Sequence, residues 1–120
     1  MRNNNIPPQL LCHSNCTNLY WSFTQQLIHH TITGCNLQTG DLLASGTISG
    51  DSESSMGSML ELCWNRTKTI QLHDTNETRQ FIQDHDEIII TGYSYNKQLD
   101  YCVGFGNVSG IILPAVKLNI

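Results

Sequence analysis

Apolar positions near the N-terminus of the chain recur at helical spacing. Residues at four-residue steps share one face of a helix, and the apolar residues spaced in this way are Leu19, Phe23 and Leu27. Ser14 precedes them as a candidate capping residue. β-branched residues weaken the end of the pattern, and Gly34 can adopt the left-handed conformation that often terminates a helix. The pattern predicts one helix from Ser14 to about Thr31.

Beyond Gly40 the helical period disappears. Short runs rich in β-branched and apolar residues are separated by Gly, Asp and Asn, which is typical of strands joined by turns. The candidate strands are residues 42–45, 58–64, 68–72, 78–82, 87–93 and 101–105. Most of the connections are short enough for antiparallel neighbours. We therefore predict a mainly β (α+β) fold with one N-terminal helix.

One connection, residues 45–57, is longer and contains three Gly, five Ser and one Thr. Small side chains leave backbone amides open to a ligand, as in many binding loops. A surface loop without a ligand has the same composition. Composition alone leaves both interpretations open.

Glu61 is the candidate for chemistry beside this loop. In a strand over residues 58–64 it shares a face with Met59 and Cys63. A carboxylate on such a face either points to solvent or lies in a partly dry cleft with a raised pKa. Its position after a loop suited to ligand binding favours the cleft, because a binding loop and a carboxylate form half of an acid–base site.

Charged residues are scarce. They make up 13% of the chain, against roughly 25% in ordinary globular proteins, and the six Lys and Arg are scattered in a chain of net charge −4. No basic stripe is present to attract nucleic acid or an anionic membrane, and no apolar run is long enough to span a bilayer or to form a signal peptide. We expect a cytoplasmic protein, either as a polar domain or as a piece of a larger one whose surface is partly covered.

The five cysteines include no CxxC pair, which favours free thiols in a cytosolic setting. A zinc site would have to be built from Cys12, His13, Cys16, His29, His30 and Cys35. The four-residue cysteine spacing lacks the paired arrangement of structural zinc modules. The acidic turn around His85 also lacks the alternating ligands of a Ca²⁺ loop and is interpreted as solvated.

Several uncommon segments occur together: LYWSFTQQLIHHTITGCNLQTGDLLASGTISG, GSMLELCW, DEIIITGY, VGFG and ILPA. In this order and at these separations they resemble the C-terminal part of the fumarylacetoacetase family. Smaller members of the superfamily usually lack the GSMLEL segment. The resemblance runs from about Leu11 to Ala115, so residues 1–10 are interpreted as an irregular lead-in. It implies that residues 11–120 are the C-terminal fragment of a catalytic domain with a mixed β-roll/sandwich fold.

The resemblance implies a hydrolase that cleaves the carbon–carbon bond of 4-fumarylacetoacetate, giving fumarate and acetoacetate in the last step of tyrosine and phenylalanine breakdown. By motif, Glu61 matches a glutamate that orients a histidine base. Thr47, with Gly46, matches the loop that contacts the substrate carboxylate. The implied cofactor is Ca²⁺ or Mg²⁺ on acidic ligands of upstream segments, and the implied assembly is a homodimer.

The implied histidine base and metal ligands match none of the 120 residues. The chain alone is therefore expected to be inactive. An alternative is a non-catalytic module that keeps only the core or dimer surface of the family. Arg66 and His85 also stand where the family has glycine in a turn, and a residue other than glycine at positive φ costs about 1 kcal/mol or more. Both turns are predicted to be distorted.

Overall fold

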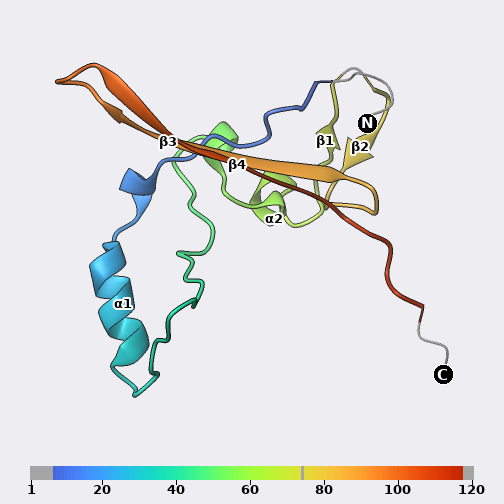
Figure 1. Cartoon of the computed structure of the whole chain (residues 1–120). Helices are drawn as coiled ribbons and strands as arrows, with labels where there is room; N and C mark the ends of the chain where they lie inside the picture. Colours follow the sequence, from blue (N-terminus) through green and yellow to red (C-terminus); the bar gives the residue numbers. More distant parts are fainter. Residues whose placement is uncertain (1–6, 74, 118–120) are drawn as a thin grey trace.

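The computed structural model describes residues 7–73 and 75–117. Its helices are the 3₁₀ helix η2 (Cys16–Asn18), α1 (Phe23–Thr31), the 3₁₀ helix η3 (Glu53–Ser55) and α2 (Met59–Leu62). Its strands are β1 (Ile70–Gln71), β2 (Thr78–Arg79), β3 (Glu87–Asn96) and β4 (Tyr101–Ile111). The β3–β4 hairpin crosses the molecule, while α1 and the segment after it form an arm to one side (Figure 1). The fold is mainly β (α+β), as predicted.

The helix α1 begins later than the apolar pattern predicted. Ser22 is its N-cap: the hydroxyl accepts a hydrogen bond from Gln25 N at 3.3 Å, and Gln25 Oε1 accepts one from Ser22 N at 2.9 Å. This reciprocal pair is a capping box. The predicted start at Ser14 is wrong because Leu19 has an extended backbone, with φ −75° and ψ 127°, and so cannot continue a helix.

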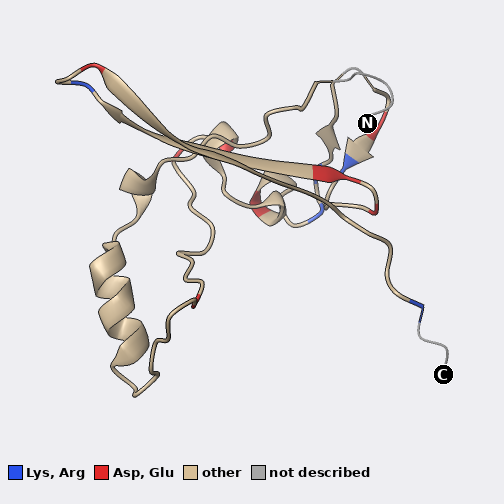
Figure 2. Ribbon diagram, in the orientation of Figure 1, with Lys and Arg blue, Asp and Glu red and all other residues tan. Residues whose placement is uncertain are grey.

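The predicted end of the helix is confirmed. α1 ends at Thr31, and Gly34 follows with φ 88°, the left-handed conformation that a glycine adopts without strain. The helix carries no Lys, Arg, Asp or Glu (Figure 2). None of the helices within the described residues is long and apolar enough to cross a membrane.

The β3–β4 hairpin is antiparallel, with a one-residue shift in register near Gly92. Phe105 and Gly106 together face Gly92, and Gly106 has φ 80°, the arrangement of a bulge with a left-handed glycine. A Cβ on Gly92 would lie 3.2 Å from the Phe105 ring, so the bulge is tightly packed. The predicted strands 87–93 and 101–105 are confirmed, and both extend further.

The other predicted strands are shorter than predicted or absent. Residues 68–72 and 78–82 contain only the two-residue strands β1 and β2, which pair antiparallel. Residues 42–45 form no strand, because the described residues offer them no partner strand and they lie beside α1. The predicted strand 58–64 is also wrong, since most of it forms α2.

Three consecutive residues after α2 have left-handed backbones. Trp64, Asn65 and Arg66 have φ of 47°, 49° and 69°. The turn is closed by Thr67 Oγ1, which donates to Trp64 O at 2.7 Å, and by Lys68 N, which donates to Cys63 O at 2.9 Å. The positive φ expected at Arg66 is therefore confirmed. The distortion of this turn relative to the family stays a prediction.

The second turn that lacks glycine lies before β3. His85 has φ 73°, and its backbone N–H donates to Ile112 O at 2.7 Å. Asp86 is more than a solvated acid: Arg79 Nε and Nη2 donate to its carboxylate at 3.0 Å each, and both side chains are 13% exposed. The hydrogen bonds from Arg79 lower the pKa of Asp86. The acidic turn is fixed to β2 by this ion pair.

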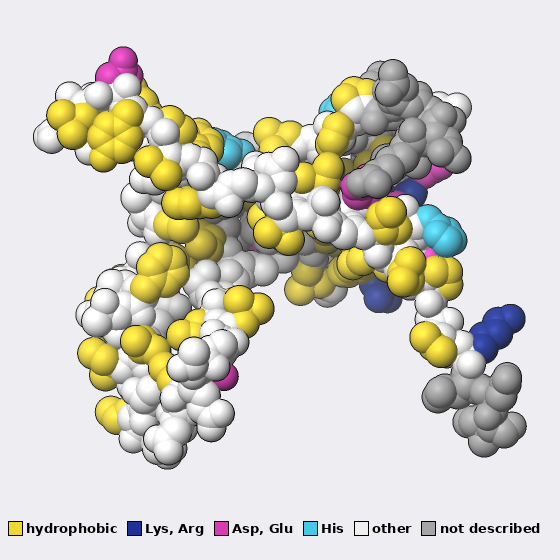
Figure 3. All heavy atoms as spheres, viewed as in Figure 1, with side chains coloured by type: hydrophobic (Ala, Val, Ile, Leu, Met, Phe, Trp, Pro, Cys, Tyr) yellow, Lys and Arg dark blue, Asp and Glu magenta, His cyan; other side chains and the backbone are white. Residues whose placement is uncertain are grey.

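The chain buries little apolar surface of its own. Within the described residues, the buried apolar side chains are Cys63 and Leu72. Large residues such as Leu42, Phe105 and Tyr20 are 96%, 73% and 87% exposed, and apolar side chains spread over the arm and the hairpin in Figure 3. The radius of gyration is 18.0 Å, whereas a compact chain of this length has about 14 Å. Local hydrogen bonds therefore define much of this structure.

The Arg79–Asp86 pair gives a prediction about the turn. Because the folded-state pKa of Asp86 is lowered, its stabilisation is present above the ordinary carboxyl pKa and is lost as pH falls through the lowered value. Asp86→Asn should weaken the turn by about 1 kcal/mol at pH 7, so the Ile112 amide should exchange with solvent roughly fivefold faster. Asp84→Asn, in the same turn, is the control. Equal exchange rates in both variants would contradict the role of the pair.

Candidate active site

Glu61 lies in the first turn of α2. Ser58 is the N-cap, with an extended backbone, and its hydroxyl accepts a hydrogen bond from Glu61 N at 3.3 Å. The Ser-x-x-Glu pattern of residues 58–61 is a known signal for a helix start, and the alternation of apolar residues in the same segment obscured it. Glu61 is exposed whereas Cys63 is fully buried, so the two do not share a face as predicted.

The Glu61 carboxylate accepts hydrogen bonds from two serine hydroxyls. Ser49 Oγ lies 2.8 Å from each carboxylate oxygen, and Ser58 Oγ lies 2.8 Å from Oε2. These bonds, that from Ser58 first and that from Ser49 second, lower the pKa of Glu61. The predicted raised pKa in a dry cleft is therefore wrong. At neutral pH Glu61 is a charged acceptor of hydrogen bonds.

The glycine- and serine-rich loop, residues 45–57, is confirmed as a loop, with η3 inside it. Gly50 N donates to Ser55 O at 2.9 Å, and Gly57 N donates to Ser49 Oγ at 3.0 Å. A Cβ on Gly57 would lie 2.5 Å from the backbone oxygen of Ile48, a separation that real Cβ atoms do not reach. The loop thus closes on itself only with glycine at position 57.

Gly46 and Thr47 are exposed residues near the start of the loop. Gly46 has φ 79°, and its carbonyl accepts a hydrogen bond from Ser45 Oγ at 3.1 Å. Within the described residues, the Thr47 hydroxyl makes no hydrogen bond and none joins Thr47 to Glu61. Ser49 is the residue that connects the loop to the carboxylate. No pattern in the sequence indicated Ser49, which lies 12 residues before Glu61.

The N-terminal segment packs against the loop. His13 N donates to Ser54 O at 2.9 Å. The pKa of the Cys12 thiol is raised by partial burial and by the charge of Glu61, so Cys12 lies within electrostatic range of the carboxylate. All five cysteines are free thiols, as predicted.

The described residues do not form a metal site. No group of three or more His, Cys, Asp or Glu side chains in this part of the chain could hold a metal ion. The nearest approach to the zinc alternative is a single contact of 3.3 Å between Cys35 Sγ and His30 Nε2. Both oxygens of Glu61 already accept hydrogen bonds from serines. The expected Ca²⁺ or Mg²⁺ would need ligands from elsewhere.

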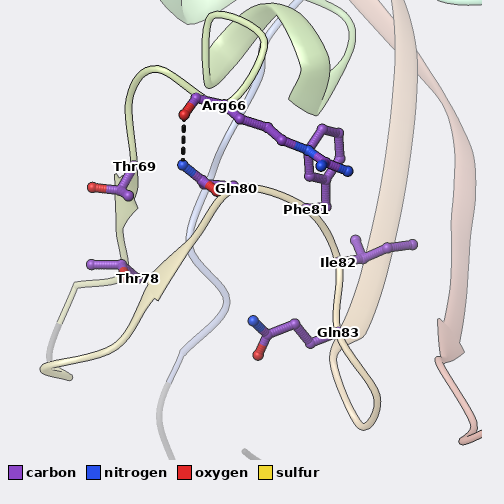
Figure 4. A pocket seen from close by; sticks show the side chains of 7 residues that line it. All are labelled: Arg66, Thr69, Thr78, Gln80, Phe81, Ile82 and Gln83. Atoms are coloured by element: carbon purple, nitrogen blue, oxygen red, sulfur yellow. Dashed lines mark hydrogen bonds between the residues drawn. The ribbon is translucent and has the colours of Figure 1, made fainter.

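A polar cavity of about 390 Å³ lies between the strained turn and β2 (Figure 4). Gln80 Nε2 donates to Arg66 O at 2.9 Å, and the Arg66 guanidinium lies 5.1 Å from the centre of the Phe81 ring. Thr69 and Thr78 point away from that guanidinium. Because these side chains do not converge on one point, the cavity is a weaker candidate than the Glu61 site.

Residues 7–108 match the family model described as fumarylacetoacetate (FAA) hydrolase C-terminal. This match covers most of the chain. The chain belongs to the fumarylacetoacetate hydrolase family. It is 52% identical to the fumarylacetoacetase of Dictyostelium discoideum over 111 residues, which are 92% of this chain and 26% of the relative.

Two other members of the family show the same relationship. The fumarylacetoacetase of Mus musculus is 52% identical over 107 residues, or 89% of this chain and 25% of the relative. That of Oryza sativa is 48% identical over 109 residues, or 91% of this chain and 24% of the relative. The chain thus spans about a quarter of the length of these relatives.

The close approach at Gly57 gives a prediction about the loop. Gly57→Ala should force Ile48 away and break the bond from the residue 57 amide to Ser49. The loop should open more often, and thermolysin should cleave residues 45–57 roughly tenfold faster. Gly110→Ala is the control, since a Cβ there would meet nothing within 4 Å. Equal cleavage of the two variants would show that the loop is not closed in this way.

Proposed function

We propose that this chain supplies the C-terminal part of the active site of a fumarylacetoacetase. The proposed reaction is hydrolysis of the carbon–carbon bond of 4-fumarylacetoacetate to fumarate and acetoacetate. The proposal is supported by about 50% identity to proteins of that name over about 90% of the chain. The observation that carries it is the position of the Glu61 carboxylate. Ser49 from the loop and Ser58 at the N-cap of α2 both donate hydrogen bonds to it.

In the proposed reaction Glu61 acts as an acceptor and not as an acid. Its lowered pKa and its two hydroxyl donors keep it charged near neutral pH. A charged carboxylate can accept a hydrogen bond from a histidine, orient the ring and favour its protonated form after it removes a proton from water. The histidine would come from another part of the protein.

Thr47 and Gly46 are proposed to bind the substrate. The Thr47 hydroxyl is exposed and has no partner within the described residues, so it can donate to a carboxylate of the ligand. The left-handed backbone of Gly46 lets the chain turn without a side chain in the way.

The remaining features concern the whole protein. Ca²⁺ or Mg²⁺ is proposed as the cofactor, with ligands from other parts of the protein, because the described residues offer no site for it. The exposed apolar side chains of β3 and β4 are proposed to pack within a mixed β-roll/sandwich and a homodimer. A cytoplasmic location is part of the same proposal.

The roles of Glu61 and Thr47 can be separated by kinetics. The test uses a chimaera, full-length mouse fumarylacetoacetase in which residues 7–117 of this chain replace the matching segment. Glu61→Gln keeps the shape but removes the charge, so kcat should fall about 100-fold with little change in KM. Thr47→Val removes a hydroxyl from the substrate contact, so KM should rise roughly tenfold with little change in kcat.

Two controls complete the experiment. Residues 1–120 alone should not hydrolyse 4-fumarylacetoacetate, because the proposed base is not among them. The chimaera without substitutions should be active. Equal and small effects of both substitutions on kcat would show that Glu61 has no catalytic role. An inactive but folded chimaera would favour the non-catalytic module.

A further inference from the structure

The direction of the hydrogen bonds around Ser49 is fixed by its neighbours. Gly57 N–H donates to Ser49 Oγ at 3.0 Å, so this oxygen is an acceptor on that side. The one hydroxyl proton of Ser49 then points to the Glu61 carboxylate, 2.8 Å from each oxygen. An N–H that polarises a hydroxyl also strengthens the bond that the hydroxyl donates. Ser49 therefore accepts a hydrogen bond from the Gly57 backbone and donates one to the Glu61 carboxylate.

Ser58 is oriented in the same way. Its oxygen accepts from Glu61 N at 3.3 Å, and its proton goes to Glu61 Oε2 at 2.8 Å. A carboxylate offers about four lone-pair positions. The hydroxyls of Ser49 and Ser58 donate to the Glu61 carboxylate, and a backbone hydrogen bond from Ser58 also favours its charged form. Glu61 stays exposed, so its carboxylate can accept a further hydrogen bond from outside this network.

The same serine belongs to the loop that carries Thr47. Ile48, between Thr47 and Ser49, lies against the Cα of Gly57 so closely that no side chain fits there. Thr47 is thus two residues from the serine whose hydroxyl contacts Glu61, in a backbone held by close packing. The substrate-binding part of the loop and the carboxylate are held as one unit.

We propose that Ser49 is a positioning residue for the reaction proposed above, and the inference rests on that function. Its hydroxyl fixes the Glu61 carboxylate relative to Thr47, with the exposed side of that carboxylate left to accept a hydrogen bond from the base. Ser49 itself touches neither the base nor the substrate in this role. Its effect on the reaction passes through Glu61.

Loss of the Ser49 hydroxyl has a defined effect on pH dependence. The hydrogen bond favours the charged carboxylate, so its removal raises the pKa of Glu61. Protonation of Glu61 forms the lower part of the acidic limb of the kcat profile, below the step that belongs to the histidine base, and this part should then move to higher pH. Among the described residues, the titratable group coupled to Glu61 is Cys12, whose thiol is neutral across that limb.

The experiment compares Ser49→Ala with Ser54→Ala in the chimaera. Ser54 is in the same loop, but its hydroxyl contacts Ser52 and not Glu61. Ser49→Ala should lower kcat roughly tenfold, move the acidic limb upward and change KM less than twofold. Ser54→Ala should change none of these. Ser49→Thr retains the hydroxyl and should restore both kcat and the position of the limb.

A double variant tests whether the effect passes through Glu61. In the Glu61→Gln background, Ser49→Ala should cause little further loss of kcat. An equal loss in both backgrounds, or an unchanged kcat and acidic limb in Ser49→Ala, would overturn the proposal. If Ser49→Ala does not fold, Ser49→Thr provides the test, and a shift in the acidic limb of its kcat profile would overturn the proposal. An unchanged kcat in the Glu61→Gln chimaera would reject the proposed role of Glu61, whereas the expected 100-fold loss there beside an unaffected Ser49→Ala rejects only the role of Ser49.

Discussion

Two serine hydroxyls donate to one carboxylate, and the arrangement of the candidate site depends on them. Ser58 both begins α2 and bonds to Glu61, so the start of the helix determines where the carboxylate points. Ser49 brings the glycine- and serine-rich loop to the same group. The left-handed turn after Cys63 then leads the chain into β1. Residues from the loop to this turn, about one sixth of the chain, contain the geometry that the proposed chemistry uses.

The site and the rest of the chain are stabilised differently. Around Glu61, short hydrogen bonds between neighbouring segments fix the side chains, and glycine at position 57 allows close backbone approach. In α1 and the long hairpin, apolar side chains such as Phe23 and Phe105 remain exposed. Hydrogen bonds order segments locally, but burial of apolar surface supplies most of the free energy of folding. The relatives are about four times longer, and the site is proposed to work only within such a whole protein.

The sequence predicted the elements that depend on strong local signals. The β3–β4 hairpin follows from β-branched runs around a turn, and the helix end follows from Gly34. The start of α1 was mispredicted because Leu19 continues the apolar spacing although its backbone is extended. Residues 58–64 carry two signals: alternating apolar residues, which favour a strand, and a Ser-x-x-Glu cap, which favours a helix. The helix forms, with Ser58 as its cap and with the hydroxyls of Ser49 and Ser58 bonded to Glu61. The partnership of Ser49 with Glu61 depends on a contact across 12 residues, which no local pattern reveals.

The protonation of Glu61 tests the central claim most directly. The carboxyl carbon of Glu61 can be titrated by ¹³C NMR in residues 1–120, with Glu61→Gln to assign its signal. Because both serines stabilise the charged form, the midpoint should lie below the ordinary glutamate value of about 4.3, and should rise in Ser49→Ala and in Ser58→Ala. A midpoint at or above the ordinary value, unchanged by either substitution, would contradict the claim that two hydroxyls hold Glu61 as a charged acceptor.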